Sequence, residues 1–159
     1  MKYSQDGIRR QDRLLDEADA TALLKSAEYG VLSMCDGNQA YGVPLNYVWD
    51  GKHSLYIHCA PVGRKLNAIA ANPRVSFCVV GRTHLLPAKF TTGYESVVLT
   101  GTATADLSDA EKHAALSLLL DKLSPNDKEL GEKYAEKSFH RVAIIRMDVE
   151  QWSGKSKKV

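Results

Sequence analysis

The sequence lacks the features by which nucleic-acid-binding, membrane and secreted proteins are most simply identified. Its 159 residues contain 21 lysines and arginines and 19 aspartates and glutamates, and the net charge of +2 is too small to indicate a nucleic-acid partner. No apolar run approaches the roughly 20 residues that a transmembrane helix needs. The first residues are polar and contain no apolar segment typical of secretory signals. We therefore expect a cytoplasmic protein without nucleic-acid or membrane partners.

Cysteine and histidine are too few and too scattered to predict a metal site. Cys35, Cys59 and Cys78 form no C-x-x-C pair, and we expect each to be a reduced thiol buried in a strand. The five histidines show no spacing typical of zinc ligands. A G-x-G-x-x-G fingerprint is also missing, so a nicotinamide nucleotide would bind only transiently. No metal is expected.

The most informative stretch is residues 56–72, YIHCAPVGRKLNAIAAN. Its first four residues suit a half-buried strand, and the Ala-Pro-Val-Gly that follows breaks that strand. Apolar residues then recur at helical spacing. Pro73 ends the helix, because the residue before a proline is driven away from the α region. The stretch therefore predicts a strand, a short turn and a helix.

The turn places Gly63, Arg64 and Lys65 in the first turn of that helix. Backbone N–H groups have no partner inside the helix there, and the helix dipole is positive. Free amides, a glycine and two cations together favour an anion site, most simply for a phosphate. The alternative is a solvated first turn that happens to carry two cations.

The remaining pattern predicts a sheet with helices before, within and after it. Pro44 interrupts the second strand and marks a sheet edge or a bulge, since proline cannot donate to a ladder. Residues 84–92 are expected to form an irregular connection, and Gly101 a bend. Ser108 and Glu111 form a capping box, and Ser124-Pro125 opens another helix. We expect strands at residues 31–35, 41–49, 56–59, 75–81, 95–105 and 140–152 and helices at 16–27, 64–71 and 108–123.

Six strands joined mostly by short turns favour antiparallel pairing and closure into a small barrel. The predicted fold is mainly β, a six-stranded antiparallel barrel with flanking helices and α+β content. We expect one domain over residues 1–159, with an N-terminal arm at 1–15 and a helical insertion at 108–137 before the last strand.

Five segments of the chain follow one another in a distinctive order. They read YGVLSM, YGVPLNYVWDG, YIHCAPVGRKLNAIAANPRVSFCVVG, TTGYESVVLTGTA and KSFHRVAIIRMDVEQWSGK. In order and spacing they resemble the flavin-binding split-barrel superfamily of pyridoxamine-5′-phosphate oxidase, and within it the nitroimidazole-resistance-protein-like branch. The resemblance runs from about residue 16 to residue 155. It implies a split barrel that binds FMN at the interface of a homodimer.

The resemblance also implies which residues contact the flavin. The phosphate signature of the family falls on residues 63–65, the site argued above from the residues alone. A strand contacting the ring system matches 41–46, largely through the backbone groups of 43–45. A tryptophan near the cofactor matches Trp152, which could instead close the end of the barrel. The partner subunit would contribute 95–96. The implied cofactor-binding residues are Val43, Pro44, Leu45, Asn46, Ile57, His58, Gly63, Arg64, Lys65, Glu95, Ser96 and Trp152.

Three departures from the family pattern change what is expected. Gly63 stands where the signature has serine, and Asn46 stands where the oxidases have a lysine near the reduced flavin. After Trp152 the chain shows no arginine-containing motif for the vitamin phosphate. The pyridoxamine-phosphate oxidase reaction is therefore not expected.

We expect an FMN-dependent oxidoreductase that passes electrons from NADH, NADPH or another donor to an electron-poor small molecule such as a nitroaromatic. No side chain is assigned a catalytic role; His58 is the nearest to a proton donor because histidine is a common acid and base near neutral pH, although it could also be a core histidine. Two alternatives remain open from the sequence. The chain could store or sense flavin without turnover, or the barrel could hold haem with a histidine ligand.

Overall fold

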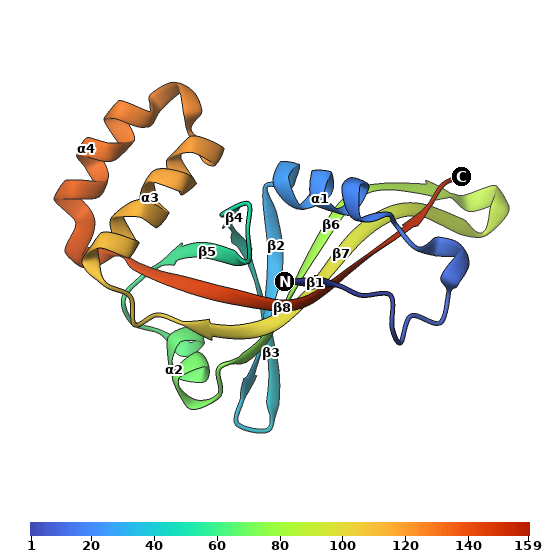
Figure 1. Ribbon diagram of the computed structural model, residues 1–159, viewed down its shortest axis with the longest axis horizontal. Helices are drawn as coiled ribbons and strands as arrows, with labels where there is room; N and C mark the ends of the chain where they lie inside the picture. Colours follow the sequence, from blue (N-terminus) through green and yellow to red (C-terminus); the bar gives the residue numbers. More distant parts are fainter.

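Three long strands form the centre of the sheet. A computed structural model describes residues 1–159. β6 (Arg74–Leu86), β7 (Thr91–Thr104) and β8 (Ala143–Lys157) run side by side along the length of the molecule, as Figure 1 shows. Each pairs with the next in antiparallel register. Their length lets one sheet serve both the barrel and a projecting hairpin.

The other strands complete a sheet of eight strands with the order β3-β2-β6-β7-β8-β5-β4. The short β1 pairs in parallel with β8 outside this path. β3 is a terminal strand of the order, so one of its edges has no strand partner. The strands not yet given are β1 (Lys2–Tyr3), β2 (Tyr29–Asp36), β3 (Gln39–Asn46), β4 (Val48–Trp49) and β5 (Ser54–Cys59).

The inward side chains of this curled sheet form the main core. On β2, on β6 up to Val79 and on β7 from Val97, buried residues alternate with more exposed ones, as expected for strands with one face on a core. Helices α1 (Glu17–Ser26) and α2 (Arg64–Ala71) add residues to the same cluster. Fully buried members include Leu24, Leu32, Tyr47, Phe77, Val79, Val97, Leu99, Ile145 and Met147. This is the split barrel with flanking helices that the sequence predicts.

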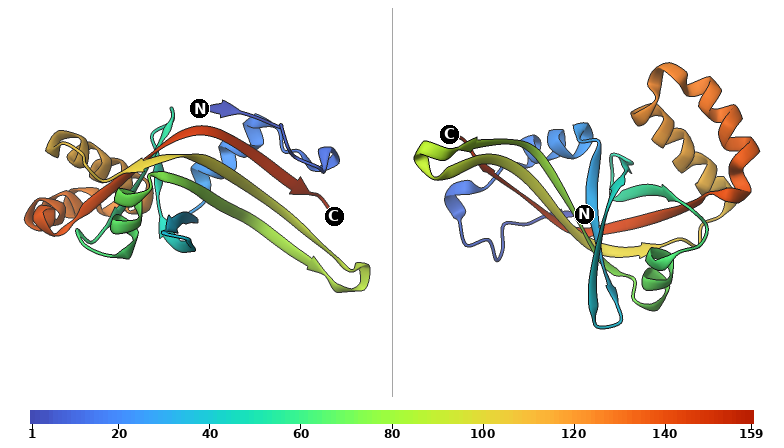
Figure 2. Two further views of the ribbon diagram at one scale, coloured as in Figure 1. Left: turned by 90° about the horizontal axis from the view of Figure 1, so that it is seen from below. Right: turned by 180° about the vertical axis from the view of Figure 1, so that it is seen from behind.

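The helical segment before β8 lies at the opposite end of the molecule from the tip of the β6–β7 hairpin (Figures 1 and 2). It comprises α3 (Asp109–Leu123), a short 3-10 turn at Pro125–Asp127 and α4 (Lys128–Ser138). The Ser108 hydroxyl accepts from the backbone N–H of Glu111 and caps α3, which confirms the predicted start. Glu111 in turn accepts from Arg146 of β8 at 2.7 Å and from the Tyr56 hydroxyl at 3.2 Å. These bonds tie α3 to the sheet.

Two expectations about the strands are wrong. The number of strands is eight, because the short β1 and β4 each add to the sheet. The second strand does not break at Pro44: β3 continues through it to Asn46 and the chain leaves the ladder at Tyr47. The sheet edge expected from Pro44 is confirmed, because β3 is an edge strand, where the missing N–H of proline deprives no neighbour of a bond.

The connection expected at residues 84–92 is also wrong. β6 continues to Leu86, a 3-10 turn occupies Pro87–Lys89, and β7 begins at Thr91, which makes one long hairpin. The last strand runs over 143–157 in place of 140–152, after a 3-10 turn at Phe139–Arg141. The helix expected from Ser124 begins at Lys128, since Ser124 makes no side-chain capping bond. The bend at Gly101 is confirmed as a bulge against β8.

The cysteines depart in part from expectation. All three are free thiols, but Cys35 is exposed and Cys59 and Cys78 are only half-buried. Cys35 and Cys78 lie on the outer faces of their strands, whereas Cys59, at the end of β5, packs against the core. None of the helices has the length and apolar character that crossing a membrane would require.

Candidate functional site

The turn between β5 and α2 presents a set of unpaired donors. The backbone amides of Gly63, Arg64 and Lys65 donate no hydrogen bond within the protein, as expected at a helix N-terminus. Gly63 has φ 144° and ψ 171°, a conformation that only glycine adopts readily. The backbone conformation of this turn therefore explains why residue 63 is a glycine. The arrangement suits a bound oxyanion.

The two cations of this turn differ in their surroundings. The Arg64 Nε donates to Asp36 Oδ2 at 2.7 Å, and its guanidinium lies 4.2 Å from the centroid of the Tyr41 ring. Lys65 is half-buried and makes no ion pair. Burial raises the pKa of the nearby Cys59 thiol, and the Lys65 charge opposes this only in part. Cys59 is therefore a neutral thiol that does not compete with an anion for the two cations.

A second group of residues lines a shallow cavity of about 350 Å³ at the free end of β3. Tyr29 of β2 and His58 of β5 reach it together with three consecutive residues of β3, and its lining is Tyr29, Pro44, Leu45, Asn46 and His58. Four of the predicted site residues thus meet in one place. His58 is exposed there, so it is not a core histidine.

The backbone around this cavity is set by strand pairing. Tyr29 lies opposite Asn46 and Gly30 opposite Leu45 in the β2–β3 ladder. The Asn46 side chain donates to the Glu28 carbonyl oxygen at 3.0 Å, which fixes the amide at the rim. Since the outer edge of β3 has no strand partner, its backbone groups are available to a ligand. The cavity and the turn are close in the sequence, because His58 lies five positions before Gly63.

Three predicted site residues point elsewhere. Val43 packs against the core, the Ile57 side chain is fully buried, and Trp152 is 3% exposed. The Trp152 ring meets Tyr3 edge to face at 4.8 Å between centroids, which is a packing role inside the barrel. Their contact with a cofactor stays a prediction, and for Val43 and Ile57 it would have to involve the backbone.

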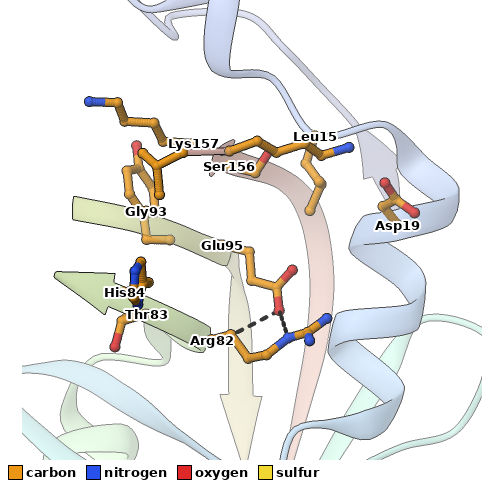
Figure 3. A pocket seen from close by; sticks show the side chains of 12 residues that line it. Leu15, Asp19, Arg82, Thr83, His84, Gly93, Glu95, Ser156 and Lys157 are labelled. Carbon is orange, nitrogen blue, oxygen red and sulfur yellow. Dashed lines mark hydrogen bonds and ion pairs between the residues drawn. The ribbon is translucent and has the colours of Figure 1, made fainter. Parts of the chain in front are cut away.

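Glu95 and Ser96, the predicted contribution of a partner subunit, lie apart from the β3 cavity. Glu95 lines a separate groove of about 370 Å³ between α1, the β6–β7 hairpin and the end of β8 (Figure 3). Its Oε1 accepts from the Arg82 backbone N–H at 3.2 Å and lies 3.9 Å from the Arg82 Nε. Ser96 is opposite Val80 on the neighbouring strand. Within one protomer these residues do not reach the cavity, as expected if they serve the other subunit.

The structure adds three residues that the sequence patterns did not single out. Tyr29 lines the cavity and is 59% exposed. Asp36 and Tyr41 contact Arg64 from the β2–β3 hairpin. No local signal marks Asp36 or Tyr41, because each acquires its contact from Arg64, about 25 residues later in the chain. An aromatic residue left exposed at the start of a strand is the one available hint, and only for Tyr29.

A family model described as pyridoxamine 5′-phosphate oxidase matches residues 16–156. A search of curated proteins found no match. Among solved structures, a proposed 5-nitroimidazole antibiotic resistance protein from Bacteroides thetaiotaomicron superposes with a TM-score of 0.72 at 18% identity, over 91% of this chain and 86% of that one.

Two further similar structures are of proteins whose names state the cofactors that they bind. A FAD-binding protein from Mesorhizobium loti has a TM-score of 0.66 and 27% identity, over 92% of this chain and 98% of that one. A FAD and haem binding protein from Mycobacterium smegmatis has a TM-score of 0.69 and 17% identity, over 91% of this chain and 72% of that one. The shared fold is therefore common to proteins with different redox groups.

Proposed function

Because the chain belongs to the pyridoxamine 5′-phosphate oxidase family, we propose that it binds FMN and acts as a flavin-dependent oxidoreductase. The observation that carries the proposal is the turn at Gly63, Arg64 and Lys65, with its free amides and two cations, which follows the cavity residue His58 in the chain. The FAD-binding relative at 27% identity supports a flavin as the ligand.

The residues present fit the phosphate end of a flavin nucleotide. Three unpaired amides and the N-terminal end of α2 provide hydrogen bonds and positive potential. Arg64 keeps its Nη1 and Nη2 groups free, since its bond to Asp36 uses Nε alone. A phosphate held there needs no serine hydroxyl, so the glycine in the family's serine position removes one donor and leaves the amides in its place.

The β3 cavity fits the ring system by its composition. It is lined by an aromatic, a proline and a leucine, with the Asn46 amide and the His58 imidazole at its rim. Flat apolar surfaces with few polar groups are typical of cofactor sites. Asn46 carries no charge, so in one protomer this cavity offers no fixed cation to the flavin. His58 is the side chain placed to exchange a proton with a bound substrate.

We also propose that two copies of the chain form the site. On the outer face of the sheet, cross-strand pairing joins Pro44, Val31, Cys78 and Val98 into an uncharged row over four strands. None of the four belongs to the core, and Val98 is 43% exposed. A second copy packed on this row would contact Ser96, which shares the outer face of β7 with Val98, whereas the Glu95 side chain faces the groove beside α1. Uncovered apolar rows of this kind are typical of protein interfaces.

The flavin would supply the redox chemistry, while the protein supplies binding, orientation and electrostatics. The substrate would be an electron-poor small molecule such as a nitroaromatic, and NADH or NADPH would serve as a transient electron donor. The chain's own residues would fix the flavin by its phosphate and leave the Tyr29 and His58 side of the cavity open to the substrate.

The double variant Arg64→Ala/Lys65→Ala tests the site. We expect folded but colourless protein, because two charge-assisted hydrogen bonds of about 1.5–3 kcal/mol each are lost, a decrease in FMN affinity of roughly a hundredfold or more. Circular dichroism and thermal unfolding report the fold, and fluorescence titration reports the Kd. Lys133→Ala, on the far side of α4, is the control. Wild-type FMN affinity in the double variant would contradict the phosphate assignment.

Three measurements on the purified protein separate the alternatives. A flavin spectrum supports the proposal, whereas a Soret band would indicate haem. Chromatography of the released cofactor distinguishes FMN from FAD. Anaerobic mixing with NADH or NADPH, followed by a nitroaromatic, distinguishes an enzyme from a carrier: a flavin that no donor reduces would indicate storage or sensing.

A further inference from the structure

The Arg64 guanidinium is held from two sides by the β2–β3 hairpin. Asp36, the last residue of β2, accepts from Nε at 2.7 Å. The ring of Tyr41, on β3, lies under the guanidinium with 4.2 Å between its centroid and Cζ. The first residue of α2 is therefore tied to a hairpin that precedes it by about 25 residues in the chain. No other ion pair joins α2 to the sheet.

The geometry of these contacts leaves the binding side of the arginine free. Arginine has five N–H donors, and the bond to Asp36 uses the one on Nε. The four on Nη1 and Nη2 make no hydrogen bond within the protein. Stacking on Tyr41 restricts rotation of the planar group without using a donor. The guanidinium is thus oriented while its fork of donors stays available.

We propose that Asp36 and Tyr41 are positioning residues that preset Arg64 for the phosphate of a flavin nucleotide. This inference rests on the proposed function. A side chain already held in its bound rotamer loses less conformational entropy when the ligand binds, so preorganisation increases affinity. Asp36 and Tyr41 touch Arg64 and act through it.

The negative charge of Asp36 would repel a phosphate. This repulsion has to be compared with the benefit of orienting Arg64. The Asp36 side chain is 41% exposed, so solvent screens its repulsion. Lys65 keeps the net charge of the group positive. The Asp36 carboxylate binds only the Nε–H of Arg64 and leaves Nη1 and Nη2 free, so a phosphate can bind the arginine without displacing Asp36. Orientation therefore outweighs repulsion in this arrangement.

Asp36→Asn and Tyr41→Leu test the inference. Exposed ion pairs and cation–π contacts are each worth about 0.2–1 kcal/mol, so each variant should raise the Kd of FMN about 1.4- to five-fold. The Kd of riboflavin, which lacks the phosphate, should not change. Tyr41→Phe keeps the stacking and should bind as the wild type does. In an Arg64→Ala background, Asp36→Asn should have no further effect.

The Arg74–Glu150 ion pair is a matched control. Its Nη1 and Oε1 atoms are 2.6 Å apart, its side chains are exposed to a similar degree, and it lies away from the turn. Glu150→Gln should leave both affinities unchanged. Tighter FMN binding by Asp36→Asn would overturn the inference and make Asp36 a competitor of the phosphate. An equal loss for FMN and riboflavin, or no loss, would also overturn it. Unchanged FMN affinity in Arg64→Ala would instead contradict the phosphate site itself.

Discussion

Replacing Gly63 should separate the demands of the backbone from those of the family signature. The family has serine at this position, and a serine hydroxyl would in principle add a phosphate contact. Gly63, however, has φ 144° and ψ 171°, where residues with a Cβ are strained. An added Cβ would meet nothing within 4 Å, so sterics with neighbours contribute no cost. The whole effect must come from the local backbone.

The expected magnitude follows from that conformation. A non-glycine residue held there costs about 1–3 kcal/mol. If the turn keeps its shape, Gly63→Ala and Gly63→Ser should lose that amount of unfolding free energy. If the turn relaxes, the amides of residues 63–65 move out of register and FMN affinity decreases. Gly63→Ser should therefore bind FMN no better than the wild type, in spite of restoring the family's serine.

Urea unfolding and FMN titration of Gly63→Ala, Gly63→Ser and the control Ala60→Ser distinguish these outcomes. Ala60 is exposed in the same loop and has no positive φ, so its variant should match the wild type in both assays. A Gly63→Ser protein as stable as the wild type and with tighter FMN binding would refute the reasoning. It would show that the turn adopts another conformation at no cost and that the serine was simply missing.

Two further predictions concern the subunit interface and the core. Val98→Asp places a charge in the uncharged row, so analytical ultracentrifugation should show monomers that have lost flavin. The control Leu130→Asp on α4 should remain dimeric. A flavin-loaded dimer of Val98→Asp would exclude this face as the interface. Burial lowers the pKa of Lys122, whose Nζ lies 3.7 Å from the Tyr47 ring centroid without a hydrogen bond, to about 8. Between pH 8 and 10.5 the unfolded state therefore binds more protons than the folded state, and wild-type stability rises with pH. Because solvent screens this half-buried side chain, Lys122→Met should be only about 1–2 kcal/mol more stable at pH 7. The gain should shrink as the pH is raised in urea unfolding, and a pH-independent difference would contradict this.

Local signals in the sequence determined α2, the start of α3 and the turn that we propose binds an anion. Pro73 ends α2, Ser108 caps α3, and Gly63 followed by two cations marks the turn. Each depends on residues within a few positions, which act in the same way in any tertiary context. The antiparallel barrel followed from strands of suitable length and from the family resemblance, and its existence did not require the exact register.

Tertiary structure alone decided the rest, because strand pairing and burial are set by residues far apart in the chain. Pro44 could stay within a strand only because β3 is at an edge, and residues 84–86 are a strand only because 91–93 pair with them. Trp152 became a core residue through its contact with Tyr3 from the other end of the chain. The contacts of Asp36 and Tyr41 with Arg64 likewise arise when the β2–β3 hairpin folds against α2, and no pattern along the sequence encodes that meeting.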